Sequence, residues 1–172
     1  ILLDTDYLVL DDSLLKLFDS TMDYQLIHTS TSPDRIIDTS MGSMSLEFIW
    51  ATVVVFRKSE YANQFFNLVG RVQRNYGYYK TLFHANANFR NDYAFAIANI
   101  IQNGYNSNRE HSIPWNMLTI ENIIKNIEIK DDFFLVREDA RAHVIAKQNM
   151  HIMDKDYLLS DNFERLVNEL VS

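Results

Sequence analysis

The 172-residue sequence contains no cysteine, so disulfide scaffolds, thiolate zinc sites and cysteine nucleophiles are excluded. With only 4 glycines and 2 prolines, it is neither collagen-like nor a low-complexity disordered chain. Basic residues are also in deficit: 16 Lys and Arg face 23 Asp and Glu, which leaves a net charge of −7. This balance argues against a surface that holds nucleic-acid phosphates, so we expect no nucleic-acid partner.

Long apolar runs are missing as well. The longest apolar stretches, such as 48–56, fall far short of the ~20 residues that cross a bilayer, so we expect no transmembrane segment. We expect a cytoplasmic protein. Hydrophobic residues nevertheless make up 47% of the chain, enough to bury a core, and the length suits one domain spanning 1–172. The sequence opens on Ile1 inside an apolar segment, so we expect that a preceding part is missing.

Hydrophobic periodicity alternates between strand and helix patterns along the chain. Strands are expected at 1–10, 24–28, 47–57, 127–129, 133–137 and 143–146, and the first of these resembles a buried strand of a parallel sheet. Helices are expected after Ser59, after Asn91 or Asp92, and after Ser160 or Asp161, and Gly104 suits the end of the second. We expect a loop at 29–45, which suits a lid, and a link at 76–89. The alternation predicts an α/β layer architecture.

Asp4 and Asp6 are spaced so that both carboxylates can converge on one ion at the end of a strand. Mg²⁺ and Mn²⁺ prefer carboxylate oxygens and keep positions open for phosphate oxygens. A solvated acidic turn is the alternative interpretation. The same spacing recurs at Asp154 and Asp156, but only the first pair lies against an apolar strand, where uncompensated carboxylates would be costly to bury.

Two further groups of residues could carry chemistry. Asp92 begins the second helix beside Arg90 and Asn91, and it either caps that helix or receives substrate hydroxyls in a cleft. Near the end of the chain, a histidine could complete a carboxylate metal site and a lysine four residues on could meet a diphosphate. The residues in this group are His143, Lys147, His151 and Lys155, whereas His28, His84 and His111 are expected to be structural.

Several segments resemble GT-A-fold glycosyltransferases, the nucleotide-diphospho-sugar transferases. The opening ILLDTDYLVL, followed by LLKLF, is similar to the family's segment around its DxD motif. ATVVVFRKSE looks like the family's middle strand, with Ala51 or Thr52 in place of its usual glycine, and NDYAF is similar to an acidic helix start. HIMDK resembles a late histidine–lysine segment with shorter spacing than usual.

The resemblance implies a GT-A-like, Rossmann-like three-layer sandwich with a mixed sheet, of which this chain is the C-terminal portion without the N-terminal nucleotide-binding half. It implies transfer of a sugar from a nucleotide-diphosphate donor to a glycan or other hydroxyl acceptor, with Mn²⁺ or Mg²⁺ as cofactor. Asp4, Asp6 and His151 would be the metal ligands. Asp92 would act catalytically on the sugar or acceptor, while Arg90, Asn91 and Lys155 would bind substrate.

Two alternatives remain open. In a haloacid-dehalogenase-like phosphatase, Asp4 would be the nucleophile and Asp6 the general acid, but no glycine here precedes an aspartate as that family's late turn requires. A non-catalytic α/β domain would bind or assemble through an aromatic cluster such as Tyr76, Tyr78, Tyr79 and Phe83. The oligomeric state is open in either case.

Overall fold

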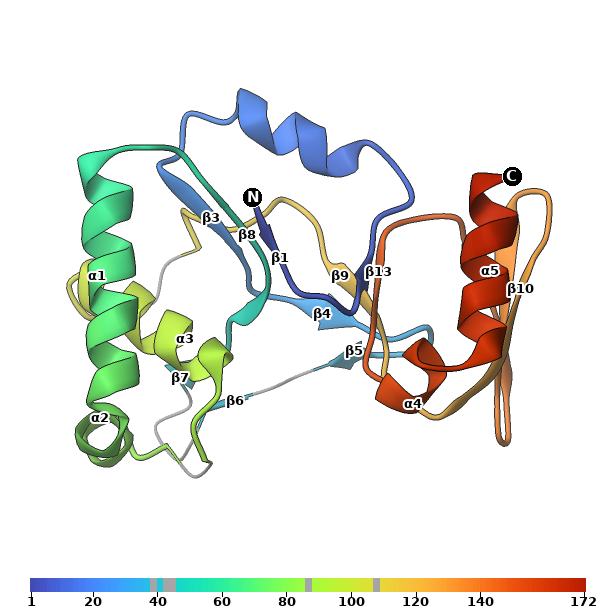
Figure 1. Cartoon of the computed structure of the whole chain (residues 1–172). Coiled ribbons are helices and arrows are strands. Elements are labelled where there is room, and N and C mark those ends of the chain that lie inside the picture. Colours follow the sequence, from blue (N-terminus) through green and yellow to red (C-terminus); the bar gives the residue numbers. More distant parts are fainter. Residues whose placement is uncertain (38–39, 42–45, 86–87, 107–108) are drawn as a thin grey trace. The chain divides into compact units, whose positions relative to one another are not determined.

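A computed structural model describes the chain except for residues 38–39, 42–45, 86–87 and 107–108. The described residues form a mixture of helices and strands with several sheets, which confirms the expected α/β class. They divide into two compact units (Figure 1). Unit 1 comprises 1–4, 13–29 and 37–116, and unit 2 comprises 5–12, 30–36 and 117–172.

A three-stranded antiparallel sheet lies at the centre of unit 1. Its middle strand, β8 (Trp50–Phe56), pairs with β1 (Leu2–Leu3) on one side and β3 (Tyr24–Ile27) on the other. Most of β8 is buried because Val, Thr and Trp side chains suit a covered pleated surface. The unit also contains a two-stranded pair, β6 (Ser40–Met41) with β7 (Leu46–Glu47), and the 3₁₀ helix η1 (Ser13–Asp19).

Helices complete unit 1. Helix α1 (Glu60–Arg74) packs against α3 (Asn91–Gln102), which also contacts β8 (Figure 1). The apolar spacing predicts an inner face at 62, 65, 66, 69 and 72 of α1 and at 94, 97, 98 and 101 of α3. These residues are buried except for Phe66 and Ile101, which are half-buried. The side chain of Ser59 caps α1 as expected. Helix α2 (Tyr76–Leu82) follows α1 in the sequence and precedes α3. It lies in the segment 76–89, which the sequence analysis predicted to be a link without a helix.

Unit 2 contains a mixed sheet of five short strands in the order β2 (Tyr7–Leu8), β13 (Met150–Ile152), β9 (Met117–Ile120), β4 (Ser30–Thr31) and β5 (Ile36–Ile37). Strand β9 runs parallel to both β13 and β4, whereas β2 runs antiparallel to β13. The sheet therefore joins segments from the beginning, middle and end of the sequence.

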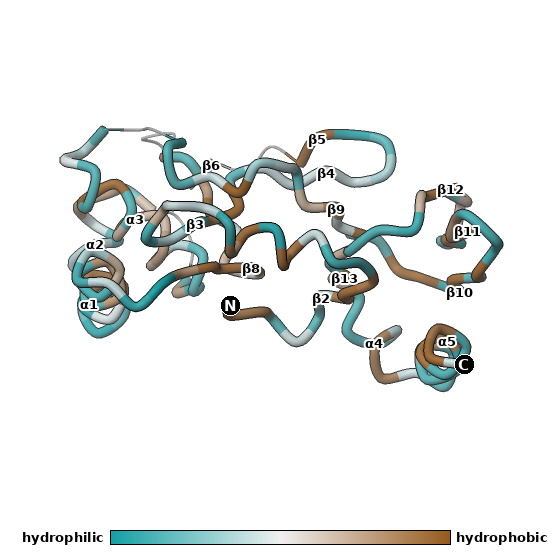
Figure 2. The backbone as a smooth tube through the Cα atoms, turned by 90° about the horizontal axis from the view of Figure 1, so that it is seen from above, coloured by the Kyte–Doolittle hydropathy of each residue, from teal (hydrophilic) through white to brown (hydrophobic). Residues whose placement is uncertain are grey.

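A meander and two helices complete unit 2. Strands β10 (Ile124–Ile129), β11 (Phe133–Glu138) and β12 (Ala142–Ala146) pair consecutively and antiparallel. The short α4 (Lys155–Leu158) precedes α5 (Asp161–Val171), whose first turn is capped by Ser160 as predicted. Helix α5 packs on β10, and Figure 2 shows it hydrophobic on the side toward β10 and hydrophilic on the opposite side.

Two sequence-based expectations about secondary structure were wrong, and two strands were missed. The first strand is not a buried parallel strand: it is split into β1 and β2, and Leu2 remains 46% exposed, because the chain turns at Thr5 and Asp6. The segment 29–45 is not one loop, since β4, β5 and β6 fall within it; its residues 38–39 and 42–45 lie outside the described structure. Strands β9 and β13 were not expected.

Among the described residues, no helix combines the length and the apolar character that crossing a membrane requires, as the short apolar runs predicted.

Candidate functional site

Three side chains that the sequence analysis singled out meet in unit 2. The carboxylate oxygen Oδ2 of Asp6 forms an ion pair with Nζ of Lys155 and lies 3.3 Å from Nε2 of His151. We call these three residues the Asp6 cluster. Asp6 is only 5% exposed, whereas the Lys155 side chain is 64% exposed, so a buried carboxylate is met by an ammonium that arrives from solvent.

The backbone around the cluster explains why these residues meet. In the β2–β13 ladder, His151 is opposite Tyr7, and the N–H of Ile152 donates to the carbonyl of Asp6 at 2.9 Å. Lys155 follows three residues later at the start of α4, where the Asp154 carboxylate caps the helix by accepting from the backbone N–H groups of Asp156 and Tyr157. Strand pairing and a helix cap therefore hold both partners near Asp6. Asp154 acts here as a cap.

A buried row of hydroxyl groups orients the imidazole of His151. Nδ1 of His151 lies 3.3 Å from Oγ1 of Thr119, which lies 2.6 Å from Oγ of Ser30; Ser30 in turn donates to the carbonyl of Met117. Because the single hydroxyl hydrogen of Ser30 is used on that carbonyl, Thr119 donates to Ser30 and accepts from Nδ1–H of His151. The other ring nitrogen, Nε2, therefore faces Asp6.

Opposing effects act on the Asp6 carboxyl. Burial raises its pKa, but the hydrogen bond from Lys155 and the positive charges of His151 and Lys155 outweigh that effect and hold the pKa below its ordinary value. The carboxylate is therefore charged at neutral pH although it is buried. Its second oxygen, Oδ1, is buried without a hydrogen-bond partner in the described part of the chain.

The Asp6 cluster could hold a divalent ion only together with ligands from outside the protein. Within the described residues, no three or more His, Asp or Glu side chains gather closely enough to hold a metal by themselves. Mg²⁺ and Mn²⁺ are, however, commonly held by one or two protein ligands together with phosphate oxygens and water. The carboxylate of Asp6 and Nε2 of His151, which lies 3.3 Å from Oδ2, could supply two such protein ligands.

The other predicted residues line a separate pocket in unit 1. This pocket has a volume of about 390 Å³ and contains Asp4, Arg90, Asn91 and Asp92 together with apolar side chains; the complete lining is Leu2, Leu3, Asp4, Ala51, Val54, Arg90, Asn91, Asp92 and Phe95. Two acids, a guanidinium and an amide thus surround an opening of small-molecule size, an arrangement that can bind the hydroxyls of a sugar.

Within this pocket, Asp92 is fixed by two contacts. Its Oδ1 accepts from the backbone N–H of Ala51 at 2.9 Å, and its Oδ2 forms an ion pair with Nη2 of Arg90 at 2.9 Å. The expectation that Asn91 or Asp92 is the N-cap of the helix was wrong, since Arg90 occupies the cap position and no side chain caps it. Asp92 is instead directed across to β8.

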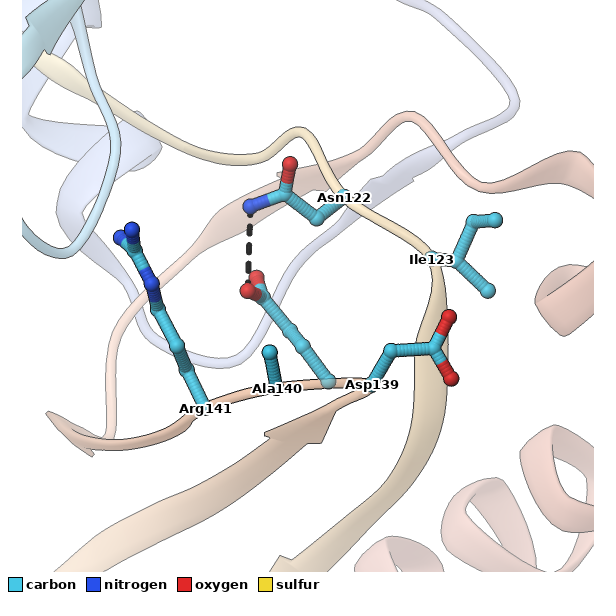
Figure 3. Close-up of a pocket in the computed structure, with 6 residues that line it drawn as sticks. Asn122, Ile123, Asp139, Ala140 and Arg141 are labelled. Atoms are coloured by element: carbon cyan, nitrogen blue, oxygen red, sulfur yellow. Dashed lines mark hydrogen bonds between the residues drawn. The ribbon is translucent and has the colours of Figure 1, made fainter.

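The remaining candidates of the C-terminal group do not join the Asp6 cluster. His143 lies in β12 with Nε2 3.4 Å from the Glu138 carboxylate, and Lys147 is an exposed residue after that strand. The Glu138 side chain is 6% exposed and also accepts from the amide of Asn122 at 3.0 Å, in a polar pocket of about 370 Å³ (Figure 3). Its carboxylate is thus used to hold the β11–β12 hairpin against the 122–123 turn.

Two supporting residues were missed by the sequence analysis. Thr119 orients His151 as described, and Asn149 fastens the end of the β2–β13 ladder. The side-chain oxygen of Asn149 accepts from the backbone N–H groups of Leu10 and Asp11, and its amide donates to the Asp11 carboxylate. The only feature of the local sequence that indicated Asn149 is its position as a polar residue directly before β13. No feature of the local sequence indicated Thr119.

No protein-family model, no curated protein and no solved structure matches this chain. The interpretation of its function therefore depends on the geometry of the residues described above.

Proposed function

We propose that this chain is part of a metal-dependent GT-A-type glycosyltransferase, in which the Asp6 cluster binds a divalent ion and the diphosphate of a nucleotide-sugar donor. Support comes from one observation above all: Asp6, His151 and Lys155, separated by about 150 residues of sequence, meet around one carboxylate. An acid, a histidine and a lysine are the residue types that the family resemblance assigns to the ion and the phosphate.

Asp6 and His151 would hold Mn²⁺ or Mg²⁺, and the assignment of Asp4 to the same ion depends on the sequence motif alone. A bound divalent ion supplies Lewis-acid stabilisation of the diphosphate that leaves the anomeric carbon. The chain's own contribution is to keep Asp6 ionised, to fix the imidazole through Thr119, and to supply the ammonium of Lys155 as a phosphate partner.

The pocket in unit 1 would receive hydroxyl groups of the sugar or the acceptor. Asp92 would accept hydrogen bonds from them and act as the catalytic carboxylate, with Arg90 holding its second oxygen and Asn91 beside it. An acid held by a backbone amide and a guanidinium keeps its orientation when substrate arrives, which is the preorganisation that catalysis needs. The acceptor would be a glycan or another hydroxyl compound.

Isothermal titration calorimetry tests this proposal. The chain is titrated with MnCl₂, and then with UDP-glucose and GDP-mannose in the presence and absence of Mn²⁺. We expect binding of at least one nucleotide sugar that requires the metal, and Asp6→Asn should weaken Mn²⁺ binding by about 100-fold or more because a charged ligand is lost.

Asp156→Asn provides a matched control, since Asp156 belongs to the second Asp-x-Asp pair, is exposed, and lies in the same unit. It removes the same charge and should leave Mn²⁺ affinity unchanged. The proposal is rejected if neither nucleotide sugar binds in a metal-dependent way, or if both variants behave alike. Release of phosphate from an aryl phosphate with Mg²⁺ would favour the phosphatase alternative instead.

A further inference from the structure

Lys155 holds the place on Asp6 that a metal ion would need. Its ammonium pairs with Oδ2, the same carboxylate oxygen that faces Nε2 of His151 at 3.3 Å. A carboxylate that is buried requires a cation close by, because its charge is poorly solvated there. In the structure, that cation is the ammonium of Lys155.

The attachment of Lys155 makes this pairing reversible. Its backbone is held at the first turn of α4 by the Asp154 cap, while its side chain is 64% exposed. A lysine side chain carries its charge on a flexible four-carbon stem, so the ammonium can leave Asp6 without any change in the backbone. Asp6 is only 5% exposed and cannot follow it into solvent.

We propose that Lys155 is the resident counter-ion of Asp6, that its ammonium competes with a divalent cation for Oδ2, and that a diphosphate bound to that cation then receives the ammonium. This inference rests on the proposed function of the Asp6 cluster. It adds an order to binding: the metal–diphosphate complex binds well, whereas the metal alone binds poorly.

The physical reason is the repulsion between like charges in a poorly solvated place. A divalent ion on Oδ2 and an ammonium on the same oxygen cannot both be close, so a free metal ion must displace Lys155 into water. When the ion carries a diphosphate, the displaced ammonium gains a new anionic partner beside the site. The affinities for metal and diphosphate are then coupled, and such coupling is reciprocal.

Opposite changes in two affinities test the inference. The dissociation constants of Mn²⁺ alone and of the preformed Mn²⁺–pyrophosphate complex are measured by calorimetry for the wild-type chain, Lys155→Met and the control Lys147→Met. We expect Lys155→Met to bind Mn²⁺ about tenfold more tightly and the Mn²⁺–pyrophosphate complex about tenfold more weakly. Lys147→Met removes the same charge from an exposed position in the same unit and should change neither constant.

A second variant covers the case in which Lys155→Met does not fold because the buried carboxylate is left without a donor. Lys155→Gln keeps an N–H donor for Asp6 and removes only the charge, and the same opposite changes are expected. The inference is overturned if both folded variants bind Mn²⁺ with wild-type affinity, or if Mn²⁺ and the Mn²⁺–pyrophosphate complex are weakened together.

If the proposed function is wrong, the titrations give a different set of affinities. If the wild-type chain binds neither Mn²⁺ nor its pyrophosphate complex, the glycosyltransferase proposal fails. The counter-ion inference is then supported if Lys155→Met or Lys155→Gln gains Mn²⁺ binding, and overturned if both variants bind no Mn²⁺.

Discussion

Thr119 and His151 illustrate how one hydroxyl group decides what a histidine can do. Thr119 is completely buried, and its Oγ1 lies between Oγ of Ser30 and Nδ1 of His151. Such a contact fixes the tautomer and the ring orientation of a metal-binding histidine, and losing it typically weakens metal binding by about 10–100-fold. The proposed metal binding of the Asp6 cluster would therefore depend on a residue that does not touch Asp6 in any described contact.

We predict that Thr119→Val weakens Mn²⁺ binding about tenfold while the chain remains folded, because valine keeps the shape but not the hydroxyl. Calorimetric titration with MnCl₂ measures the effect, and circular dichroism checks the fold. Thr31→Val is the control: Thr31 lies on β4 of the same sheet, and its hydroxyl makes only a long contact of 3.5 Å with the carbonyl of Met117. If both variants lose Mn²⁺ affinity equally, Thr119 stabilises the sheet and does not orient His151, which would contradict the prediction.

His28 is a second residue whose environment sets its charge. Its side chain is 1% exposed and lies 3.3 Å from the Glu47 carboxylate, but neither ring nitrogen makes an aligned hydrogen bond within the described residues. Burial lowers the pKa of His28, and the neighbouring Glu47 charge only partly opposes that effect. The folded protein thus favours the neutral imidazole.

We predict that stability falls as the pH decreases below about 6.5, the ordinary pKa of histidine, because the unfolded chain then binds a proton that folded His28 resists. His28→Gln should reduce the difference between the free energies of unfolding at pH 7.5 and pH 5.5, measured by urea denaturation. His84→Asn changes an exposed histidine and should keep the wild-type difference. A pH dependence that His28→Gln leaves intact would contradict this prediction.

The ends of helix α3 show which sequence features predicted a helix boundary correctly. Gly104 follows the C-cap Asn103 of α3 with φ of +63°, and its N–H donates to the carbonyl of Ile101 at 3.1 Å. The left-handed conformation is costly for residues with a Cβ atom, so glycine at this position is the predicted end of the helix. The start of α3 lacked such a signal, and there the predicted cap was wrong.

Gly104→Ala is predicted to lower the free energy of unfolding by about 1 kcal/mol, because alanine is strained at this φ although nothing lies within 4 Å of the added Cβ. Gly77→Ala is the matched control, for which the opposite sign of the stability change is expected. Gly77 lies inside α2, also with nothing within 4 Å, and alanine should stabilise that helix by about 0.5–1 kcal/mol. Chemical denaturation measures both, and a destabilising Gly77→Ala would contradict the expected difference in sign.

At the scale of the whole molecule, each unit has its own hydrophobic core, but neither unit is one continuous stretch of chain. Unit 2 is assembled from 5–12, 30–36 and 117–172, and the first two of these segments interrupt unit 1. The buried residues of the unit 2 core all come from 118–166, and Leu8 and Leu10 from the beginning of the chain pack against them, whereas the core of unit 1 is drawn from 24–98. Because the chain passes repeatedly from one unit to the other, we expect the two cores to unfold together, as the single-domain prediction requires.

Leu166→Ala tests this expectation. Leu166 is 2% exposed in the core of unit 2, and truncation should cost about 2–4 kcal/mol. Both tryptophans, Trp50 and Trp115, belong to unit 1 and report its unfolding by fluorescence. We predict that the fluorescence midpoint falls together with the circular dichroism midpoint. An unchanged fluorescence midpoint would mean that the units unfold separately and would contradict the prediction of one domain.

The sequence by itself determined the features that depend on neighbours within a few residues. The apolar spacing of 62–72 predicted the buried face of α1, Ser59 and Ser160 predicted two helix starts, and the alternation of elements predicted the α/β class. In each case, the stabilising contacts are made within one helical turn or along one strand.

Only the tertiary structure decided which short segments became strands and which polar residues met. Strands β9 and β13 have 4 and 3 residues, and such segments are stable as strands only when distant partners supply their hydrogen bonds. That pairing brings His151 to Asp6 and places Thr119 behind the imidazole. The energy of a strand pair depends on both partners, so no local pattern around residue 151 could show which carboxylate it would face.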